Sequence, residues 1–159
     1  MKITFADFYP CLADFFCSVN GVLGTWLDST LSMNSHVDNT CSNAFYYLYN
    51  IRRIRNYLFR RSTETLIHAF VSSRVDYCNS LLYSQPAYQL NKLQRVQNAA
   101  ARLIFLESKY CYVRLLLYNL HWLPVKFRID FKILLLTYKA INGVSPFYLQ
   151  ELISLKKAM

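Results

Sequence analysis

Apolar residues recur at steps of three and four along most of this chain, the spacing that places them on one face of an α-helix. The pattern predicts a first helix over 35–58, with Asn34 or Ser35 capping its N-terminus. It predicts a second helix over 62–83, with Ser62 as its cap. The side of the second helix that is predicted to be buried carries Leu66, Ala69, Phe70, Val75 and Cys78.

The same spacing predicts three later helices, over 86–104, 113–120 and 124–142. A proline opens the first and the last of these, where its missing N–H costs nothing, and Gly143 suits the left-handed conformation that follows a helix end. The most apolar stretch, 129–141, is interrupted by charged residues and is too short to cross a bilayer. We therefore predict that it lies in the core.

A different pattern precedes the first helix. Residues 22–28 form a short β-branched and aromatic run with a polar cluster after it, which predicts a strand and a turn. The chain has only 3 Gly and 4 Pro, which disfavours an all-β fold. The predicted fold is mainly α, with a short N-terminal strand followed by about five helices. It divides into an irregular segment over 1–20, the strand and turn over 21–33, and a helical region over 34–155.

Basic side chains outnumber acidic ones, with 18 Lys and Arg against 9 Asp and Glu, and the formal net charge is +9. Such an excess attracts polyanions or acidic membrane surfaces. Guanidinium groups can bind phosphate through two hydrogen bonds at once. The candidate nucleic-acid-binding residues are Arg52, Arg53, Arg55, Arg60 and Arg61, with a second set of Lys92, Arg95 and Arg102 that Lys109 follows.

Aromatic residues strengthen the first of these sets, because tyrosine rings can stack on bases or sugars. The neighbouring rings are Tyr46, Tyr47, Tyr49 and Tyr57. The alternative interpretation of the same cations is a solvated helix face, with positive charge near a helix C-terminus. The sequence does not orient the two basic sets relative to each other.

Residues for enzyme chemistry are not gathered in any recognisable motif. Two-metal phosphoryl transfer needs several neighbouring carboxylates, whereas Asp7, Asp14 and Asp28 are far apart. The three histidines share no metal-ligand spacing with one another or with the cysteines. We therefore predict no catalytic residue, no metal, no cofactor and no small-molecule substrate, and we do not expect the chain to be an enzyme by itself.

The cysteines and the apolar runs bear on the compartment. Five cysteines without a CxxC pair are typical of reduced, packed thiols inside the cell. No stretch has the form of a signal peptide or of a membrane span. The expected location is intracellular, and these patterns do not distinguish cytoplasm from nucleus.

Four long segments of the chain carry a family resemblance. They are LGTWLDSTLSMNSHV (23–37), TETLIHAFVSSRVDYCNSLLY (63–83), QLNKLQRVQNAAARLI (89–104) and LHWLPVKFRIDFKILLLTYKAINGVSPFYLQELI (120–153). In sequence and in order they resemble the C-terminal part of LINE-type, non-LTR retrotransposon reverse transcriptases of the jockey and chicken-repeat kind. The resemblance is specific because several long segments agree rather than one short motif.

The resemblance implies the end of the palm, the thumb and the region beyond it. Leu23, Gly24 and Asp28 match the family's last palm strand, near the grip on the primer end. The helices that follow are similar to a thumb, which holds the template–primer duplex. The sequence FADF over 5–8 only superficially resembles the family's catalytic turn, because Phe8 stands where a second Asp belongs.

The family's fingers, most of its palm and its endonuclease have no counterpart in these residues, and 1–20 is interpreted as unrelated to the family. The resemblance thus implies a catalytically incomplete piece of an RNA-directed DNA polymerase. It would be a thumb-like helical bundle that binds RNA or an RNA–DNA hybrid regardless of sequence. The alternative is a helical protein-interaction module or an inert retrotransposon remnant, which would self-associate through exposed apolar faces. A peripheral membrane role is disfavoured, because no helix combines a dense Lys/Arg face with an uninterrupted apolar one.

Overall fold

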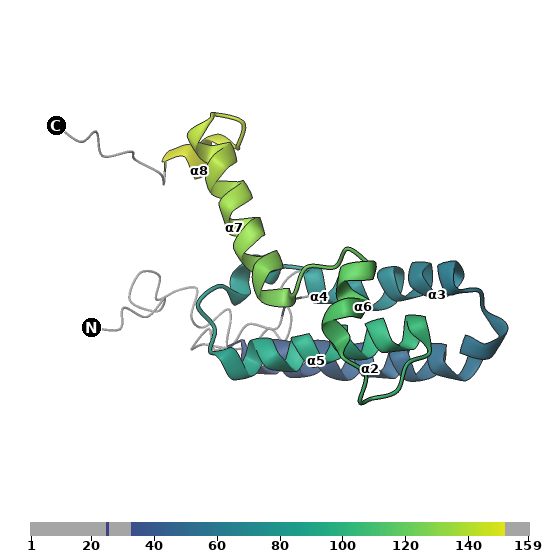
Figure 1. The fold of residues 1–159 in the computed structure, drawn as a ribbon. Helices are drawn as coiled ribbons and strands as arrows, with labels where there is room; N and C mark the ends of the chain where they lie inside the picture. The colour runs from purple at the N-terminus through teal and green to yellow at the C-terminus, as the bar shows by residue number, and fades with distance from the viewer. Residues whose placement is uncertain (1–24, 26–32, 152–159) are drawn as a thin grey trace.

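The computed structural model describes Thr25 and residues 33–151, and this part of the chain is mainly α-helical (Figure 1). The helices are α2 (Asn34–Ile54), α3 (Arg60–Ile67), α4 (Ser73–Asp76), α5 (Ala87–Phe105), α6 (Val113–Asn119), α7 (Val125–Ile141) and α8 (Phe147–Glu151). Short turns of 3-10 helix, η2 (Arg55–Tyr57) and η4 (Asn79–Leu82), and one π-helical turn, η3 (His68–Ser72), lie between them. The prediction of a mainly α fold is confirmed. The predicted strand over 22–28, apart from Thr25, and the segment 1–20 lie outside the described residues.

The body of the molecule is built around α2 and α5, which lie side by side (Figure 1). They run in the same direction, since the Asn34 side chain at the start of α2 accepts a hydrogen bond from Tyr88 near the start of α5, and Arg55 just after α2 reaches Leu103 near the end of α5. The α3–η3–α4 segment returns along both helices, and α6 packs on α5. Small residues contribute to the core on these two helices, with Ala44, Ala100 and Ala101 fully buried.

The second helix, predicted over 62–83, is interrupted by a π-helical turn and ends at Asp76, before the 3-10 turn η4. Its buried residues, Thr63, Ile67, Val71 and Val75, follow one another at steps of four. A regular α-helix turns 100° per residue, so three steps of four would rotate the last side chain about 120° away from the first. The wider turn of η3 absorbs part of this rotation and keeps the four side chains on the core. The predicted buried side was therefore wrong at Ala69 and Phe70, which are exposed.

Both predicted N-caps were also wrong. Helix α2 follows Met33, which is buried in the left-handed conformation at φ 54°, and no side chain caps the helix. Asn34 instead uses its side-chain oxygen to accept hydrogen bonds from α5. Helix α3 begins at Arg60, two residues before Ser62, and Phe59 precedes it in an extended conformation. Neither helix start has a side-chain cap.

The signals for the later helices were correct. Pro86 and Pro124 immediately precede α5 and α7, and Gly143 follows α7 with φ 70°. The start of α7 is held by α5, because the backbone N–H of Val125 donates to Gln94 Oε1 at 2.9 Å. This bond satisfies one of the N–H groups that the first turn of a helix leaves unpaired.

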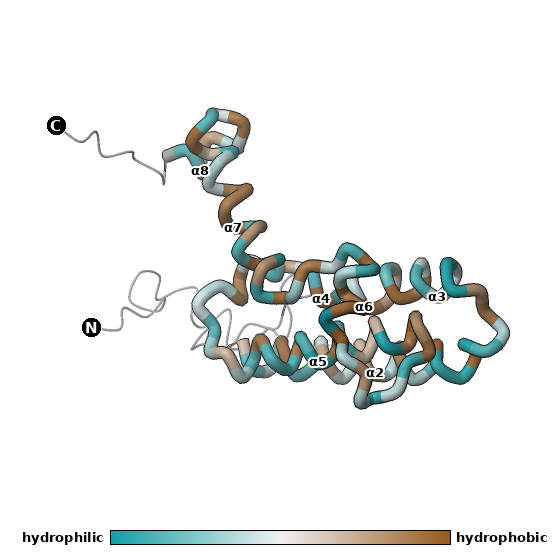
Figure 2. Tube along the Cα trace, viewed as in Figure 1, coloured by the Kyte–Doolittle hydropathy of each residue, from teal (hydrophilic) through white to brown (hydrophobic). Residues whose placement is uncertain are grey.

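Beyond this anchor α7 leaves the body and carries α8 at its far end (Figure 1). Only Val125, Ile129 and Ala140 of α7 are buried. Brown, apolar segments of the helix stand clear of the other helices in Figure 2. The prediction that 129–141 lies in the core was therefore wrong for this structure. An apolar helix is buried only where another element covers it, and among the described residues nothing covers most of α7.

Candidate nucleic-acid interface

A cleft of about 660 Å³ opens at the end of the body where α2 and α5 finish. Its cationic lining residues come from four segments: Arg52 from α2, Arg55 from η2, Arg102 from α5, and Lys109 from the segment after α5. Glu107 is the one carboxylate in the lining. The remaining lining residues are Phe45, Leu48, Tyr49, Asn56, Ala99, Leu103 and Leu106. The cleft thus combines an excess of positive charge with an apolar and aromatic wall.

Arg55 lines the cleft, but its charged group is buried and bound to the protein backbone. Only 6% of the residue is exposed. Its guanidinium donates to the carbonyl oxygens of Leu103 at 3.0 Å, Ile104 at 2.7 Å and Leu58 at 2.8 Å. Two of these carbonyls lie in the last turn of α5, where helix carbonyls lack partners and a positive charge is favoured. Arg55 therefore clamps the two helix ends together, and its assignment as a residue that contacts nucleic acid is not supported by this geometry.

Arg52 and Arg102 come from the two predicted basic sets, and the structure brings them to the same cleft. Arg52 is exposed, and Arg102 is partly buried. Neither forms an ion pair with any carboxylate in the described part of the chain. The buried Nε of Arg102 has no hydrogen-bond acceptor among these residues. These cations are therefore not neutralised by the protein around them.

Lys109, which comes after Arg102 in the second basic set, completes the group of cations at the cleft. It extends over the ring of Tyr110, with Nζ 4.9 Å from the ring centroid. Its sequence signal was weak because it stands in a non-helical segment beyond α5 rather than on a patterned face. Only the turn after Leu106, which has φ 59°, brings it back to the cleft.

The other predicted cations lie elsewhere. Arg53, Arg61 and Arg95 are exposed and do not line the cleft. Arg60 packs its guanidinium 4.0 Å from the centroid of the Phe105 ring. Lys92 pairs with Asp38 at 2.5 Å, and that hydrogen bond raises the pKa of the lysine. The eight predicted residues thus divide into a group at the cleft and a larger group spread over the body.

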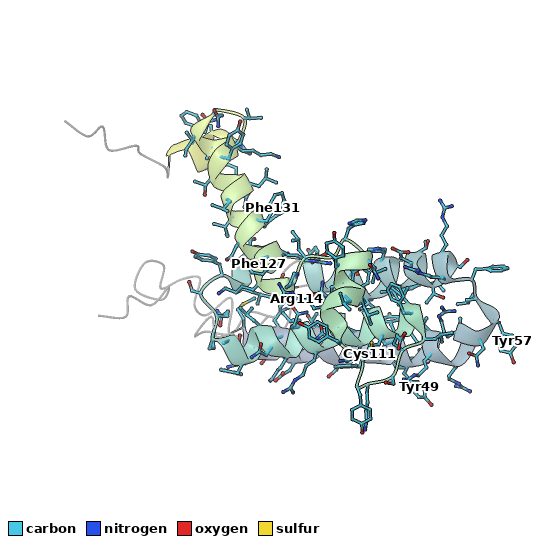
Figure 3. All side chains as sticks on the ribbon, in the orientation of Figure 1. Tyr49, Tyr57, Cys111, Arg114, Phe127 and Phe131 are labelled. Atoms are coloured by element: carbon cyan, nitrogen blue, oxygen red, sulfur yellow. The ribbon has the colours of Figure 1, made fainter. Side chains whose placement is uncertain are left out.

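The tyrosines near the first basic set also divide. Tyr49 lines the cleft and is 62% exposed (Figure 3). Tyr47 is partly buried and stacks on Phe70 at 5.3 Å between ring centroids, and Arg74 packs on its ring. Tyr57 is highly exposed but does not line the cleft.

Other chemistry is sparse in the residues that the structure describes. Within Thr25 and 33–151, no three His, Cys, Asp or Glu side chains gather in a way that could hold a metal ion. Cys41 is buried, and burial together with the charge of Asp38 raises the pKa of its thiol to about 11. No helix in these ranges is long and apolar enough to span a membrane.

Fold and cleft together define a mainly α-helical protein with a basic, aromatic-lined cleft between two parallel helices. Comparison of the chain with protein families, with curated proteins and with solved structures finds no match. The cleft and the surface of the helices are therefore the features that bear on function.

Proposed function

We propose that this chain is similar to the thumb and C-terminal region of a non-LTR retrotransposon reverse transcriptase and acts as a binding unit rather than a catalyst. Its ligand is RNA or an RNA–DNA hybrid, held without regard to sequence. The observation that carries the proposal is the convergence of Arg52, Arg102 and Lys109 on one cleft beside Tyr49.

Charge supports this ligand. Arg52, Arg102 and Lys109 face the single carboxylate of Glu107, and no ion pair within the described ranges ties them down. Phosphate contacts by Lys and Arg supply most of the sequence-independent affinity for nucleic acids, because they release condensed counterions. A cleft with unpaired cations is suited to that role.

Shape and aromatic content favour a strand over a closed duplex inside the cleft. A volume near 660 Å³ is that of a small-ligand pocket, so the cleft would accept a short stretch of strand while the rest follows the basic body. Stacking of a base on an exposed aromatic ring contributes about 1–3 kcal/mol and tolerates any base. Tyr49 offers such a ring next to Arg52.

The test is fluorescence anisotropy with labelled single-stranded RNA and with an RNA–DNA hybrid over a salt series. The cleft variant is Arg52→Gln with Lys109→Gln, and the control is Arg53→Gln with Arg61→Gln, which removes the same charge from exposed positions outside the cleft. Arg55 stays intact in both, because its removal would disturb the fold.

The cleft variant should bind at least about tenfold more weakly than the control, as expected for the loss of two charge-assisted contacts. Its slope of log affinity against log salt should become shallower by about 1.4 for single-stranded RNA. Equal losses in the two variants would show that binding depends on overall charge and not on the cleft. Wild-type affinity that does not change with salt would rule out the proposal as a whole.

A second candidate function is protein interaction, and the exposed apolar side of α7 favours it. The side chains of Phe131, Leu134 and Tyr138 are all more than half exposed. Contiguous exposed apolar surface of this kind marks interaction sites more often than chance exposure does.

A further inference from the structure

The exposed apolar residues of α7 follow a regular repeat. They are Phe127, Phe131, Leu134, Tyr138 and Ile141, and the steps between them are four, three, four and three. All five are between 48% and 68% exposed. We call these five side chains the α7 seam. Phe127 lies at the base of α7 beside the body, and Phe131 lies further out along the helix (Figure 3).

Steps of four and three place these side chains on one narrow stripe of the helix, which is the arrangement of the a and d positions in a two-stranded coiled coil. The seam occupies the a and d positions, with Phe131 and Tyr138 at a. The lysines of the helix, Lys126, Lys132 and Lys139, then fall at the outer positions b and c. None of them stands between two helices that meet along the seam.

The body of the molecule does not use the seam. The buried residues Val125 and Ile129 attach the first turns of α7 to the body, and α7 contacts η4 and α5 there. Arg128 is turned toward the body as well, where it pairs with Asp76 at 2.7 Å. The opposite side of the helix remains as a continuous apolar stripe.

We infer that α7 pairs with α7 of a second copy of this chain through the seam, as a two-stranded coiled coil. A second copy is the partner that supplies a helix of equal length with the same repeat, and an isologous pairing closes on itself. The inference extends the second candidate function by naming the partner. It does not depend on the cleft.

The area sets the strength of this pairing. An aromatic side chain buries about 150–250 Å² when fully covered, so five side chains exposed by about half to two-thirds would cover on the order of 500 Å² per copy. A pair would then bury on the order of 1,000 Å², the lower end for a specific interface. The dimer should therefore dissociate on dilution. Two chains of net charge +9 also repel each other, and salt screens that repulsion.

The test is sedimentation equilibrium of the full chain over a range of concentrations, at low and high salt. Leu134→Lys places a charge at the centre of the seam, and Tyr118→Lys places the same charge on α6 at a residue that is 77% exposed. Because both positions are exposed, thermal unfolding by circular dichroism should be the same for the two variants and wild type at concentrations low enough to keep wild type monomeric.

Wild type should dimerise with rising concentration and more tightly at high salt, which is opposite to the salt dependence of nucleic-acid binding. Leu134→Lys should raise the dimer dissociation constant at least tenfold, and Tyr118→Lys should leave it unchanged. A folded wild type that stays monomeric at every concentration would overturn the inference, as would a dimer that both variants weaken equally. Failure here with intact binding in the cleft would leave the proposed nucleic-acid function standing.

Discussion

Replacing Arg55 by alanine is expected to destabilise the fold more than any other single change among the predicted basic residues. The guanidinium is buried and donates three hydrogen bonds to backbone carbonyls, two of them at the end of α5. In Arg55→Ala these carbonyls lose a cationic donor, and the ends of α2 and α5 lose their link.

The magnitude follows from these contacts. Hydrogen bonds to charged groups contribute about 1.5–3 kcal/mol each, but they are not additive here, because the variant also removes the cost of burying a charge. A net loss of about 3 kcal/mol in the free energy of unfolding is expected. Arg55→Lys should lose about 1–2 kcal/mol, since an ammonium group keeps the charge but cannot reach several carbonyls in one plane as guanidinium does.

The assay is urea unfolding followed by far-UV circular dichroism, with Arg53→Ala as the control. Arg53 is exposed on α2, so its loss should change the free energy of unfolding by less than about 0.5 kcal/mol. If Arg55→Ala were as stable as wild type but bound RNA more weakly, Arg55 would be a contact residue and not a clamp.

Three further perturbations are expected to have the following results. Gln94→Ala leaves the N–H of Val125 without its acceptor and should cost about 1–2 kcal/mol in urea unfolding, with no such loss in an exposed control, Asn91→Ala. Burial lowers the pKa of His36, so as the pH falls the unfolded chain binds a proton on this imidazole before the folded chain does. The stability that neutral His36 contributes is therefore complete above pH 6.5 and is lost as the pH falls below it. The melting temperature of His36→Gln should lack this loss at low pH. The Cys41 thiol, with its pKa raised from 9.0 to about 11, should be alkylated later than Cys78 and Cys111 in mass spectrometry at neutral pH, and its contribution to stability should be lost between pH 9 and 11. Alkylation of Cys41 as fast as of the two partly exposed cysteines would contradict its burial.

The ends of the later helices could be predicted from sequence because they depend on local chemistry. Proline fixes its own φ and lacks an N–H, which suits the positions before α5 and α7. Glycine adopts positive φ without a steric penalty, as Gly143 does after α7. Neither property depends on what lies nearby in space.

The features that were missed depend on contacts between distant residues. In the sequence, Arg55 is one arginine among several. Its role is visible only from its hydrogen bonds to Leu103 and Ile104, which are about fifty positions further along the chain. The π-helical turn η3 keeps residues spaced four apart on the core, and no residue type in the sequence indicates such a turn. The prediction that 129–141 lies in the core was wrong because hydrophobicity indicates that a helix has an apolar face to bury. It does not indicate which element packs on that face.

The cleft could be predicted in part. Arg52 and Arg102 were both expected to bind, yet the 49 intervening positions give no sign that they share a face. The parallel course of α2 and α5 decides this, and it carries Arg95 and Lys92 away from the cleft along the same helix. Lys109 reaches the cleft through the turn after Leu106, which the spacing of apolar residues does not predict.

The most direct test of the central claim is to find where a strand lies on the protein. RNA containing photoreactive uridines would be crosslinked by light to the wild-type chain, and the modified peptides would be mapped by mass spectrometry. Tyr118 and Tyr148 are at least as exposed as Tyr49, so random encounters would mark all three. Binding in the cleft predicts crosslinks concentrated at Tyr49 and Phe45, and their loss in Arg52→Gln with Lys109→Gln. Crosslinks spread evenly over the exposed tyrosines, unchanged in that variant, would contradict the account.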